Sequence, residues 1–369
     1  MAKLYEVRDR KPVNLFCTNR VEYFDLGPAV EVSSRILLSE PGWDLYALDF
    51  ENSLASFVKL NAGPEPYSAP FLYAELFERA VRLVLLPFDE FLVLAQDVGE
   101  PKHLVHLLSM GRCGSTIAHH LFNSVDGVLC LSEPDTYLGL AMARRELSDV
   151  KGIALLKACD RFHFLAGTHH GDHTLVIKHH SQSLFQAERL VAASPSAKFI
   201  FMYRDAESWG DSVFRMAQSF GHPPIQNRKE RELLWYILSA GADPETMGDI
   251  IDIADDSAQS DRWIAVLWAI HAIEYSKLFA GGLKMHAINF ADLKTSRAQT
   301  VRRLFEFCSL PTNELERALK VFDRDSQAGT NLARDRKTIG FSSVNYANFR
   351  DTLSKFESVN APGVILPSL

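Results

Sequence analysis

A strand, a glycine-bearing turn and a helix follow one another near residue 110, and this unit constrains the fold more than any other. The apolar run at 104–108 predicts a buried strand, and residues 117–123 predict a helix. The first backbone N–H groups of a helix are unpaired and carry the positive end of its dipole, so such a turn can bind an anion. A purely structural connection explains the segment almost as well while it stands alone.

The residues of this turn narrow the choice of anion. Arg112 carries a fixed positive charge, and Ser115 and Thr116 offer hydroxyl groups at the start of the helix. A Walker A loop needs a glycine–lysine pair before its serine or threonine, and this pair is missing. We therefore do not expect the β- and γ-phosphates of ATP. Cys113 lies in the turn and is interpreted mainly as a small packing residue, because no partner base is evident nearby.

The bulk properties exclude several classes of protein. The chain has 369 residues, enough for one large core or two modest ones. A net charge of −7 argues against a nucleic-acid partner. The N-terminus lacks the apolar segment of a signal peptide, and the longest apolar region, 80–98, contains charged residues and a proline, so we expect no membrane span. Five cysteines without metal-type spacing predict reduced thiols and a cytoplasmic protein.

The chain divides near residue 100. Residues 1–100 are rich in aromatic residues and turns, contain a helix-like stretch at 70–86, and are predicted to form a small α+β domain or a cover for an acceptor site. Residues 101–369 alternate strand and helix signals, which predicts an α/β fold with a parallel sheet flanked by helices. The predicted strands are 104–108, 128–131, 173–178, 198–203 and 284–289. The predicted helices are 115–124, 136–147, 152–166, 183–193, 205–220, 229–240, 262–280, 296–308 and 313–322.

A second polar group follows the predicted strand at 198–203. Arg204 ends this strand, Asp205 is a candidate N-cap for the next helix, and Ser212 follows two turns into it. Ligands of open α/β sheets bind at the carboxyl ends of the strands, and a guanidinium with a hydroxyl suits a phosphate monoester. The alternative is a surface ion pair of Arg204 with Asp205 or Glu207.

Two other strand ends carry groups suited to proton transfer. Lys178 could neutralise charge on a leaving phosphate, and His180 could accept a proton. Glu133 follows the strand at 128–131, where partial desolvation would raise its pKa into the range of a base. The alternatives are a solvated strand end for Lys178 and His180, and an acid at a helix N-terminus for Glu133.

Taken in order, these segments resemble the sulfotransferases. Residues 111–116 resemble the family's 5′-phosphosulfate loop, and Arg204 to Ser212 resemble its 3′-phosphate motif. The segment 285–293 with the helix before Pro311 looks like the family's late strand, turn and helix. The resemblance covers about residues 103–340. It implies a P-loop-type parallel sheet that binds 3′-phosphoadenosine 5′-phosphosulfate (PAPS).

The resemblance also implies roles for individual residues. The 5′-phosphosulfate would be held by Gly111, Arg112, Cys113, Gly114, Ser115 and Thr116. The 3′-phosphate would be held by Arg204 and Ser212, and more loosely by a late basic run, Arg334, Arg336 and Lys337. Lys178 matches the lysine that stabilises the transferring sulfuryl group, together with Arg112.

The base is ambiguous at this stage. His180 stands two residues after Lys178, as the catalytic histidine does in cytosolic small-molecule sulfotransferases. Glu133 stands 21 residues after Arg112, much like the catalytic glutamate of tyrosylprotein sulfotransferases and many bacterial relatives. We favour Glu133, because its surrounding motif looks more like the second group.

The resulting hypothesis is in-line transfer of a sulfuryl group from PAPS to a hydroxyl or amine of a small-molecule, saccharide or peptide acceptor. A kinase or hydrolase on the same scaffold and a non-catalytic PAPS-binding protein are the alternatives. His169 and His173 have helix-like spacing that could suggest zinc, but Gly167 and Gly171 interrupt a helix there, and we expect no metal. The sequence identifies neither the acceptor nor the oligomeric state.

Overall fold

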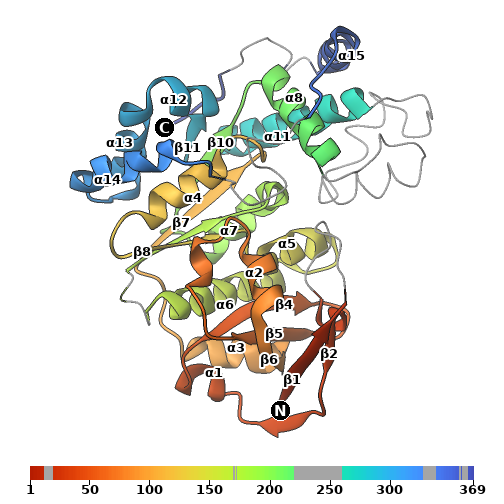
Figure 1. Cartoon of the computed structure of the whole chain (residues 1–369), viewed down its shortest axis with the longest axis vertical. Helices are drawn as coiled ribbons and strands as arrows, with labels where there is room; N and C mark the ends of the chain where they lie inside the picture. The colour runs from red at the N-terminus through yellow and green to blue at the C-terminus, as the bar shows by residue number, and fades with distance from the viewer. Residues whose placement is uncertain are drawn as a thin grey trace. The chain divides into compact units, whose positions relative to one another are not determined.

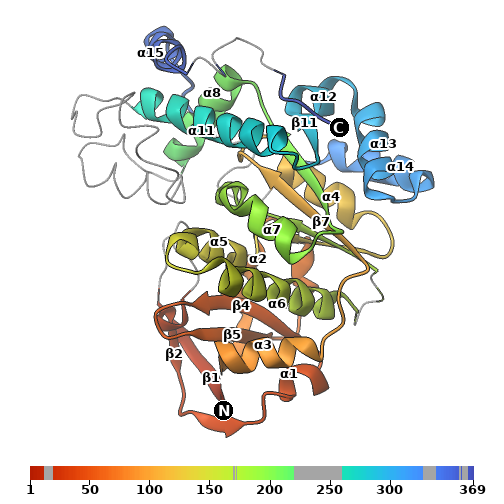
Figure 2. The ribbon, with the colours of Figure 1, turned by 180° about the vertical axis from the view of Figure 1, so that it is seen from behind.

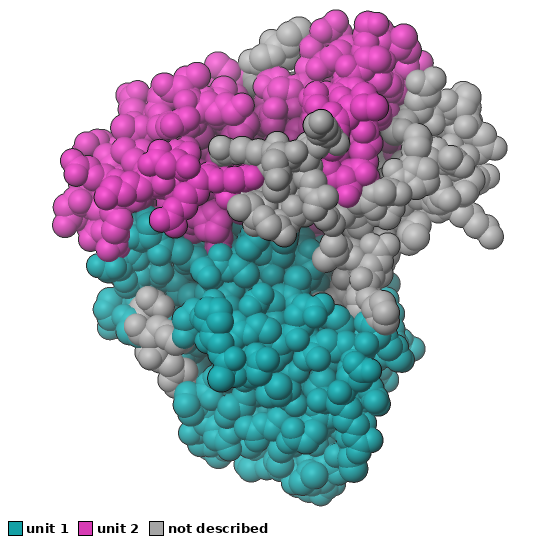
Figure 3. Space-filling view, in the orientation of Figure 1, with its two compact units in different colours: residues 1–106, 122–180, 188–198 teal, residues 107–121, 181–187, 199–369 magenta. Residues whose placement is uncertain are grey.

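The structure is a computed structural model of the whole chain (Figures 1 and 2). It describes residues 1–11, 20–168, 171, 173–219, 260–326, 338–356, 359 and 365–369. The helix predicted at 229–240, His169 and the basic residues Arg334, Arg336 and Lys337 lie outside the described residues. These residues group into two compact units (Figure 3), which are treated separately below. Unit 1 comprises residues 1–106, 122–180 and 188–198, and unit 2 comprises residues 107–121, 181–187 and 199–369.

The first sheet, in unit 1, has six strands and is antiparallel at each pair for which the register is given. Its order is β2-β1-β6-β5-β4, with β3 paired to β1. The strands are β1 (Ala2–Arg10), β2 (Phe24–Leu26), β3 (Val30–Val32), β4 (Trp43–Asp49), β5 (Leu54–Leu60) and β6 (Ala80–Pro87). The helices of this region are α1 (Ile36–Ser39), α2 (Leu72–Arg79) and α3 (Phe88–Gln96), with short 3-10 turns at Val21–Tyr23 and Pro66–Ser68.

The helix expected at 70–86 is correct only in its first half. The chain leaves α2 after Arg79 and continues as β6, which is hydrogen-bonded between β1 and β5. Leu83, Val84 and Leu86 are fully buried there. Two neighbouring strands satisfy the backbone of β6, so tertiary pairing overrides the local helical signal.

The second sheet has five strands in the order β11-β10-β7-β9-β8 and confirms the predicted α/β class with a parallel sheet. The pairs β8–β9 and β10–β11 are parallel, with Ser132 opposite Lys178 and Tyr203 opposite Asn289. The strands are β7 (His103–Ser109), β8 (Val128–Ser132), β9 (Thr174–Lys178), β10 (Lys198–Tyr203) and β11 (Met285–Asn289). All five lie within two residues of their predicted positions.

Helices follow these strands as the alternation predicts. They are α4 (Ser115–Asn123), α5 (Asp135–Met142), α6 (Asp149–Thr168), α7 (Ala187–Ala193), α8 (Ala206–Ser219), α11 (Ser260–Ala280), α12 (Phe290–Thr295), α13 (Arg297–Cys308), α14 (Leu315–Leu319) and α15 (Ser343–Leu353). The 3-10 turns between them are Ala143–Arg145, Ser181–Gln186, Thr312–Glu314 and Lys320–Asp323. Neither α12 nor α15 was predicted from the sequence as a separate helix, and α15 begins with a capping box at Ser342.

Within unit 1, the first sheet and α6 share one core. The ring of Phe162 on α6 lies 4.9 Å from that of Phe57 on β5 and stacks on that of Phe91 on α3 at 5.3 Å. Residues from both sides of position 100 thus bury the same aromatic surface. Among the helices that the structure describes, none has the length and apolarity needed to cross a membrane.

Candidate active site

The turn before α4 adopts a backbone that few residues tolerate. Gly111, Arg112 and Gly114 all have positive φ, at 73°, 50° and 87°. Arg112 is the uncommon case, because a side chain is disfavoured in this region and such strain gathers at functional positions. A Cβ on Gly114 would lie 2.7 Å from the ring of Phe290, so glycine is required there for space as well as for φ.

Side chains of unit 2 hold this turn in place. The indole of Trp209 donates a 2.9 Å hydrogen bond to the Gly111 carbonyl oxygen, and the Met110 N–H donates to Met202 O at 3.3 Å. The thiol of Cys113 is fully buried and points at the same Met202 carbonyl, 3.2 Å away. This agrees with the interpretation of Cys113 as a packing residue.

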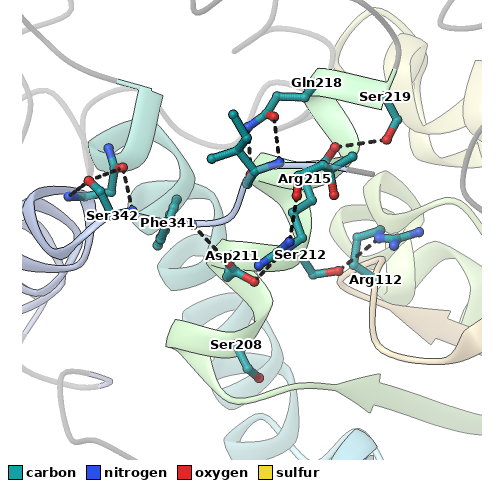
Figure 4. A network of polar contacts seen from close by, with 12 residues as sticks. Arg112, Ser208, Asp211, Ser212, Arg215, Gln218, Ser219, Phe341 and Ser342 are labelled. Atoms are coloured by element: carbon teal, nitrogen blue, oxygen red, sulfur yellow. Dashed lines mark hydrogen bonds and ion pairs between the residues drawn. The ribbon is translucent and has the colours of Figure 1, made fainter. Parts of the chain in front are cut away.

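Two arginines and a serine meet beside the turn. Arg112 Nε donates to Ser212 Oγ at 3.2 Å, as Figure 4 shows, and Arg204 NH1 lies 3.5 Å from the Arg112 carbonyl oxygen. Burial and the neighbouring charge of Arg204 lower the pKa of Arg112, and burial lowers that of Arg204. The Arg204 guanidinium thus contacts the backbone of Arg112, and the two arginine charges are near enough to influence each other, which favours an anion that would share both.

The surface ion pair considered as the alternative for Arg204 is not found among the described residues. Arg204 Nε donates to Ser208 Oγ at 2.8 Å, its guanidinium lies 4.9 Å from the Phe290 ring centre, and it makes no ion pair with any described residue. Glu207 instead binds Arg350 through two hydrogen bonds of 2.6 and 2.7 Å. The predicted N-cap is confirmed, since Asp205 Oδ1 accepts from the Ser208 N–H at 3.1 Å.

The chain that follows the late basic run lies along α8, the helix of Ser212. Arg215 NH1 donates to Thr338 O at 3.0 Å, Gln218 Nε2 to Ile339 O at 2.9 Å, and the Phe341 N–H to Asp211 Oδ1 at 2.7 Å (Figure 4). Residues 338–341 are therefore fixed on the helix that carries Ser212. Arg334, Arg336 and Lys337 themselves are not described.

In unit 1, the three candidates for proton transfer and charge stabilisation form one cluster. Lys178 Nζ lies 2.5 Å from Glu133 Oε1 and 3.1 Å from Ser132 Oγ, and His180 Nδ1 lies 3.5 Å from Glu133 Oε2. The pairing of β8 with β9 places Ser132 opposite Lys178, so both strands end at this cluster. Lys178 is 1% exposed, which excludes the solvated strand end considered above.

Glu133 has an unusual backbone and a pKa that differs from the expected one. Its φ is 57°, and its N–H donates to the Lys178 carbonyl oxygen at 2.7 Å. Burial raises its pKa, but its interactions with Lys178 and His180 together outweigh burial and leave the pKa below its ordinary value. The expectation of a raised pKa was wrong, because the sequence did not show that a buried ammonium would contact this carboxylate.

The chemistry of the cluster follows from these protonation states. Burial, with opposing contributions from Glu133 and Lys178, lowers the pKa of His180. At neutral pH the His180 imidazole is therefore neutral, and Glu133 is an ionised carboxylate. Both groups that were predicted as alternative bases can accept a proton, and they contact each other.

Three features of this cluster were missed by the sequence analysis. Ser132 links Lys178 to the carbonyl oxygen of Pro70, while Phe71 and Tyr73 lie against Lys178 and His180. Only the density of aromatic residues before position 100 hinted at such a role. Within the described residues, no group of three or more histidine, cysteine, aspartate or glutamate side chains is arranged to hold a metal ion.

No family model and no curated protein sequence matches the chain. Solved structures similar to it include three sulfotransferases. The sulfotransferase domain from the curacin biosynthetic pathway has 15% identity and a TM-score of 0.38 over 73% of this chain and 95% of that one. Sulfotransferase STF9 from Mycobacterium avium has 10% identity and a TM-score of 0.42 over 74% and 80% of the two chains. Sulfotransferase STF1 from Mycobacterium tuberculosis H37Rv has 12% identity and a TM-score of 0.44 over 78% and 83%.

These structures come from the family that the motifs resemble. Their TM-scores lie below 0.5 and their identities do not exceed 15%, so the assignment of function depends on the residues of this chain.

Proposed function

We propose that this chain is a sulfotransferase that moves a sulfuryl group from PAPS to a hydroxyl or amine of an acceptor. The observation that carries the proposal is the meeting of Arg112, Arg204 and Ser212 beside the turn 110–116. A Walker-type ATP site needs a lysine that this turn lacks. The chain has in its place two guanidinium groups, which suit a donor with separate 5′- and 3′-anionic groups.

The residues present fit the donor's anionic groups. Gly111 to Thr116 would hold the 5′-phosphosulfate, since Ser115 and Thr116 begin α4 and the first N–H groups of a helix have no partner within the helix. Arg204 and Ser212 would hold the 3′-phosphate. Arg334, Arg336 and Lys337 would extend this second position, and the attachment of residues 338–341 to α8 supports that role.

The donor supplies an activated sulfuryl group, and its transfer leaves negative charge on the bridging oxygen of adenosine bisphosphate. In the proposed reaction the acceptor's oxygen or nitrogen forms a bond to sulfur while the bond from sulfur to that bridging oxygen breaks. In this proposal Arg112 and the N-terminus of α4 would stabilise the developing charge, and Lys178 would have the charge-stabilising role that the resemblance assigns to it. Such preorganised electrostatic groups usually supply the largest catalytic contribution.

Proton transfer is assigned to the cluster in unit 1. Before the reaction, the charges of Lys178 and Glu133 balance each other at 2.5 Å. When Glu133 or His180 takes the acceptor's proton, the cluster gains one positive charge. Lys178 is then less neutralised at the stage at which the leaving group becomes negative, so the ion pair couples proton transfer to charge stabilisation.

The experiment is a transfer assay with PAPS labelled in its sulfuryl group, using phenols, alcohols, sugars, amines and guanidinium compounds as acceptors. We expect label on at least one acceptor class, with one adenosine bisphosphate formed per transfer, and no transfer by the Lys178→Met variant. Transfer of phosphate from ATP, with no sulfuryl transfer to any acceptor, would establish a kinase instead.

A further inference from the structure

A short segment of the N-terminal region, residues 70–73, contacts the cluster of Glu133, Lys178 and His180. Ser132 Oγ donates a 2.5 Å hydrogen bond to Pro70 O and in turn accepts one from Lys178 Nζ. The Lys178 ammonium lies 5.9 Å from the ring centre of Phe71. The ring of Tyr73 lies 5.6 Å from the imidazole of His180, at an interplanar angle of 38°. All of these residues belong to unit 1.

The segment is anchored on both sides. Before it, Asn123 Nδ2 donates to Tyr67 O at 3.0 Å, and the Tyr67 hydroxyl donates to Asp44 at 2.8 Å. After it, α2 begins and buries Leu72 and Leu76 to within 2% of full burial. With both ends held, the rings of Phe71 and Tyr73 have little freedom to leave the charged groups.

Tyr73 meets His180 with its ring and is uncharged. Burial, with the nearby carboxylates of Glu133 and Asp135, raises the pKa of Tyr73, so its hydroxyl stays protonated. The titratable groups around the imidazole are Glu133, Lys178, the neighbouring His179 and Tyr73. Tyr73 is the phenol of this set, and its ring lies tilted beside the imidazole while Nδ1 lies toward Glu133.

We propose that Tyr73 is a positioning residue for proton transfer, whose ring fixes the His180 imidazole against Glu133 and keeps water from it, while Phe71 covers the Lys178 ammonium. This role in proton transfer rests on the proposed function, because the proton is the one that the acceptor loses in that reaction. It gives residues 70–73 a defined part in the active site, which the sequence left without one. Removing the ring would admit water to both candidate bases, Glu133 and His180, and their different responses would show which one accepts the proton.

Hydration shifts the pKa values of His180 and Glu133 in opposite directions. The imidazole of His180 loses the burial that disfavours its charged form, so its pKa rises toward the ordinary histidine value. The carboxylate of Glu133 loses the burial that favours its neutral form, so its pKa falls further. A pH–rate profile of a Tyr73 variant would therefore shift its acidic limb upward for a histidine base and downward for a glutamate base.

The direct test is an NMR titration of the histidine imidazoles in the full chain, with the His180 signal assigned by its loss in His180→Gln. We compare the wild-type chain with Tyr73→Leu, which removes the ring, and Tyr73→Phe, which keeps it. Tyr5→Leu is the matched control, because Tyr5 is also half-buried in unit 1 and lies on β1. Thermal unfolding is followed for each variant, and Tyr73→Met replaces Tyr73→Leu if the latter does not fold.

We expect the His180 titration to move to higher pH in Tyr73→Leu and to stay unchanged in Tyr73→Phe and Tyr5→Leu. An unchanged titration in folded Tyr73→Leu or Tyr73→Met overturns the inference. The readout needs no sulfuryl transfer, so its failure is distinct from failure of the proposed function. An active wild-type chain with an unchanged titration refutes only the role of Tyr73, whereas a chain that transfers no sulfuryl group refutes the function.

Discussion

Lys178 and Glu133 form a largely buried ion pair, with Nζ 2.5 Å from Oε1, between residues that the sequence placed at the ends of two separate strands. Lys178 Nζ also donates to Ser132 Oγ, and the Glu133 backbone N–H donates to the Lys178 carbonyl oxygen. The pair thus joins the ends of β8 and β9 through both backbone and side chains. Its energetic and catalytic consequences can be measured separately.

The first prediction concerns stability. Glu133→Gln leaves a buried ammonium without its counter-charge and is expected to lose about 3–5 kcal/mol of unfolding free energy. Lys178→Met leaves a carboxylate that is 18% exposed, so it is expected to lose less. The double variant removes both charges and should lose less than the sum, with a coupling of about 1–3 kcal/mol. Chemical denaturation of the four proteins measures this coupling. Strict additivity would mean that the pair contributes nothing.

The second prediction concerns turnover. Glu133→Gln or His180→Ala should lower the rate of sulfuryl transfer by about 10²–10⁴, the usual effect of losing a positioned base, while donor binding persists. Single-turnover assays with labelled PAPS separate the two effects. If both variants keep near-normal turnover, the base lies elsewhere.

The third prediction uses two glycines of the turn as a matched pair. Gly111 and Gly114 both have positive φ, but an added Cβ meets no atom within 4 Å at Gly111 and the Phe290 ring at 2.7 Å at Gly114. Gly111→Ala should therefore cost only the backbone strain of about 1–2 kcal/mol, and Gly114→Ala more, with a larger loss of donor affinity. Equal effects in thermal unfolding and calorimetry would exclude a steric role for Phe290.

Most of the second sheet could be predicted from the sequence, because its strands are continuous apolar runs that parallel sheets require. The residues at the ends of β8, β9 and β10 were also correctly identified as polar groups at carboxyl ends. Their protonation states, however, depend on tertiary contacts. The lowered pKa of Glu133 depends on contacts with Lys178 and His180, and no local pattern encodes them.

The N-terminal region shows the same limit. The segment 80–87 has the composition of either a helix or a strand, and its pairing with β1 and β5 decides the outcome. Likewise, Phe71 and Tyr73 differ from the other aromatic residues of this region only in what they contact. Contacts between residues this far apart in sequence carry no periodic signal.

The fourth prediction concerns pH. Burial lowers the pKa of His106 and His163 to about 3 and that of His271 to about 4. Below the ordinary histidine pKa of 6.5, the unfolded chain therefore binds more protons than the folded chain, and stability is lost as the pH falls. Asp160 has the opposite sign, since burial raises its pKa to about 6 and its contribution is lost as the pH rises through that value.

Three histidines outweigh this one carboxyl group, and each unbalanced proton changes stability by about 1.4 kcal/mol per pH unit. Urea unfolding at pH 7.5, 6.5 and 5.5 should show a steady decrease, with a shallower slope for His163→Gln. A stability that is flat or increases toward pH 5.5 would show that these histidines are not held neutral.

The central claim is the identity of the donor, and calorimetric titration with adenosine 3′,5′-bisphosphate and with ATP–Mg²⁺ tests it most directly. Arg204→Ala serves as the test variant and Arg317→Ala as the control. Arg317 lies on α14 and forms an ion pair with Glu314 in the 3-10 turn just before that helix. The chain should bind the bisphosphate. Arg204→Ala should weaken that binding about 10–100-fold, the usual effect of losing charged hydrogen bonds, and Arg317→Ala should leave it unchanged. Tight binding of ATP–Mg²⁺ without binding of the bisphosphate would contradict the assignment.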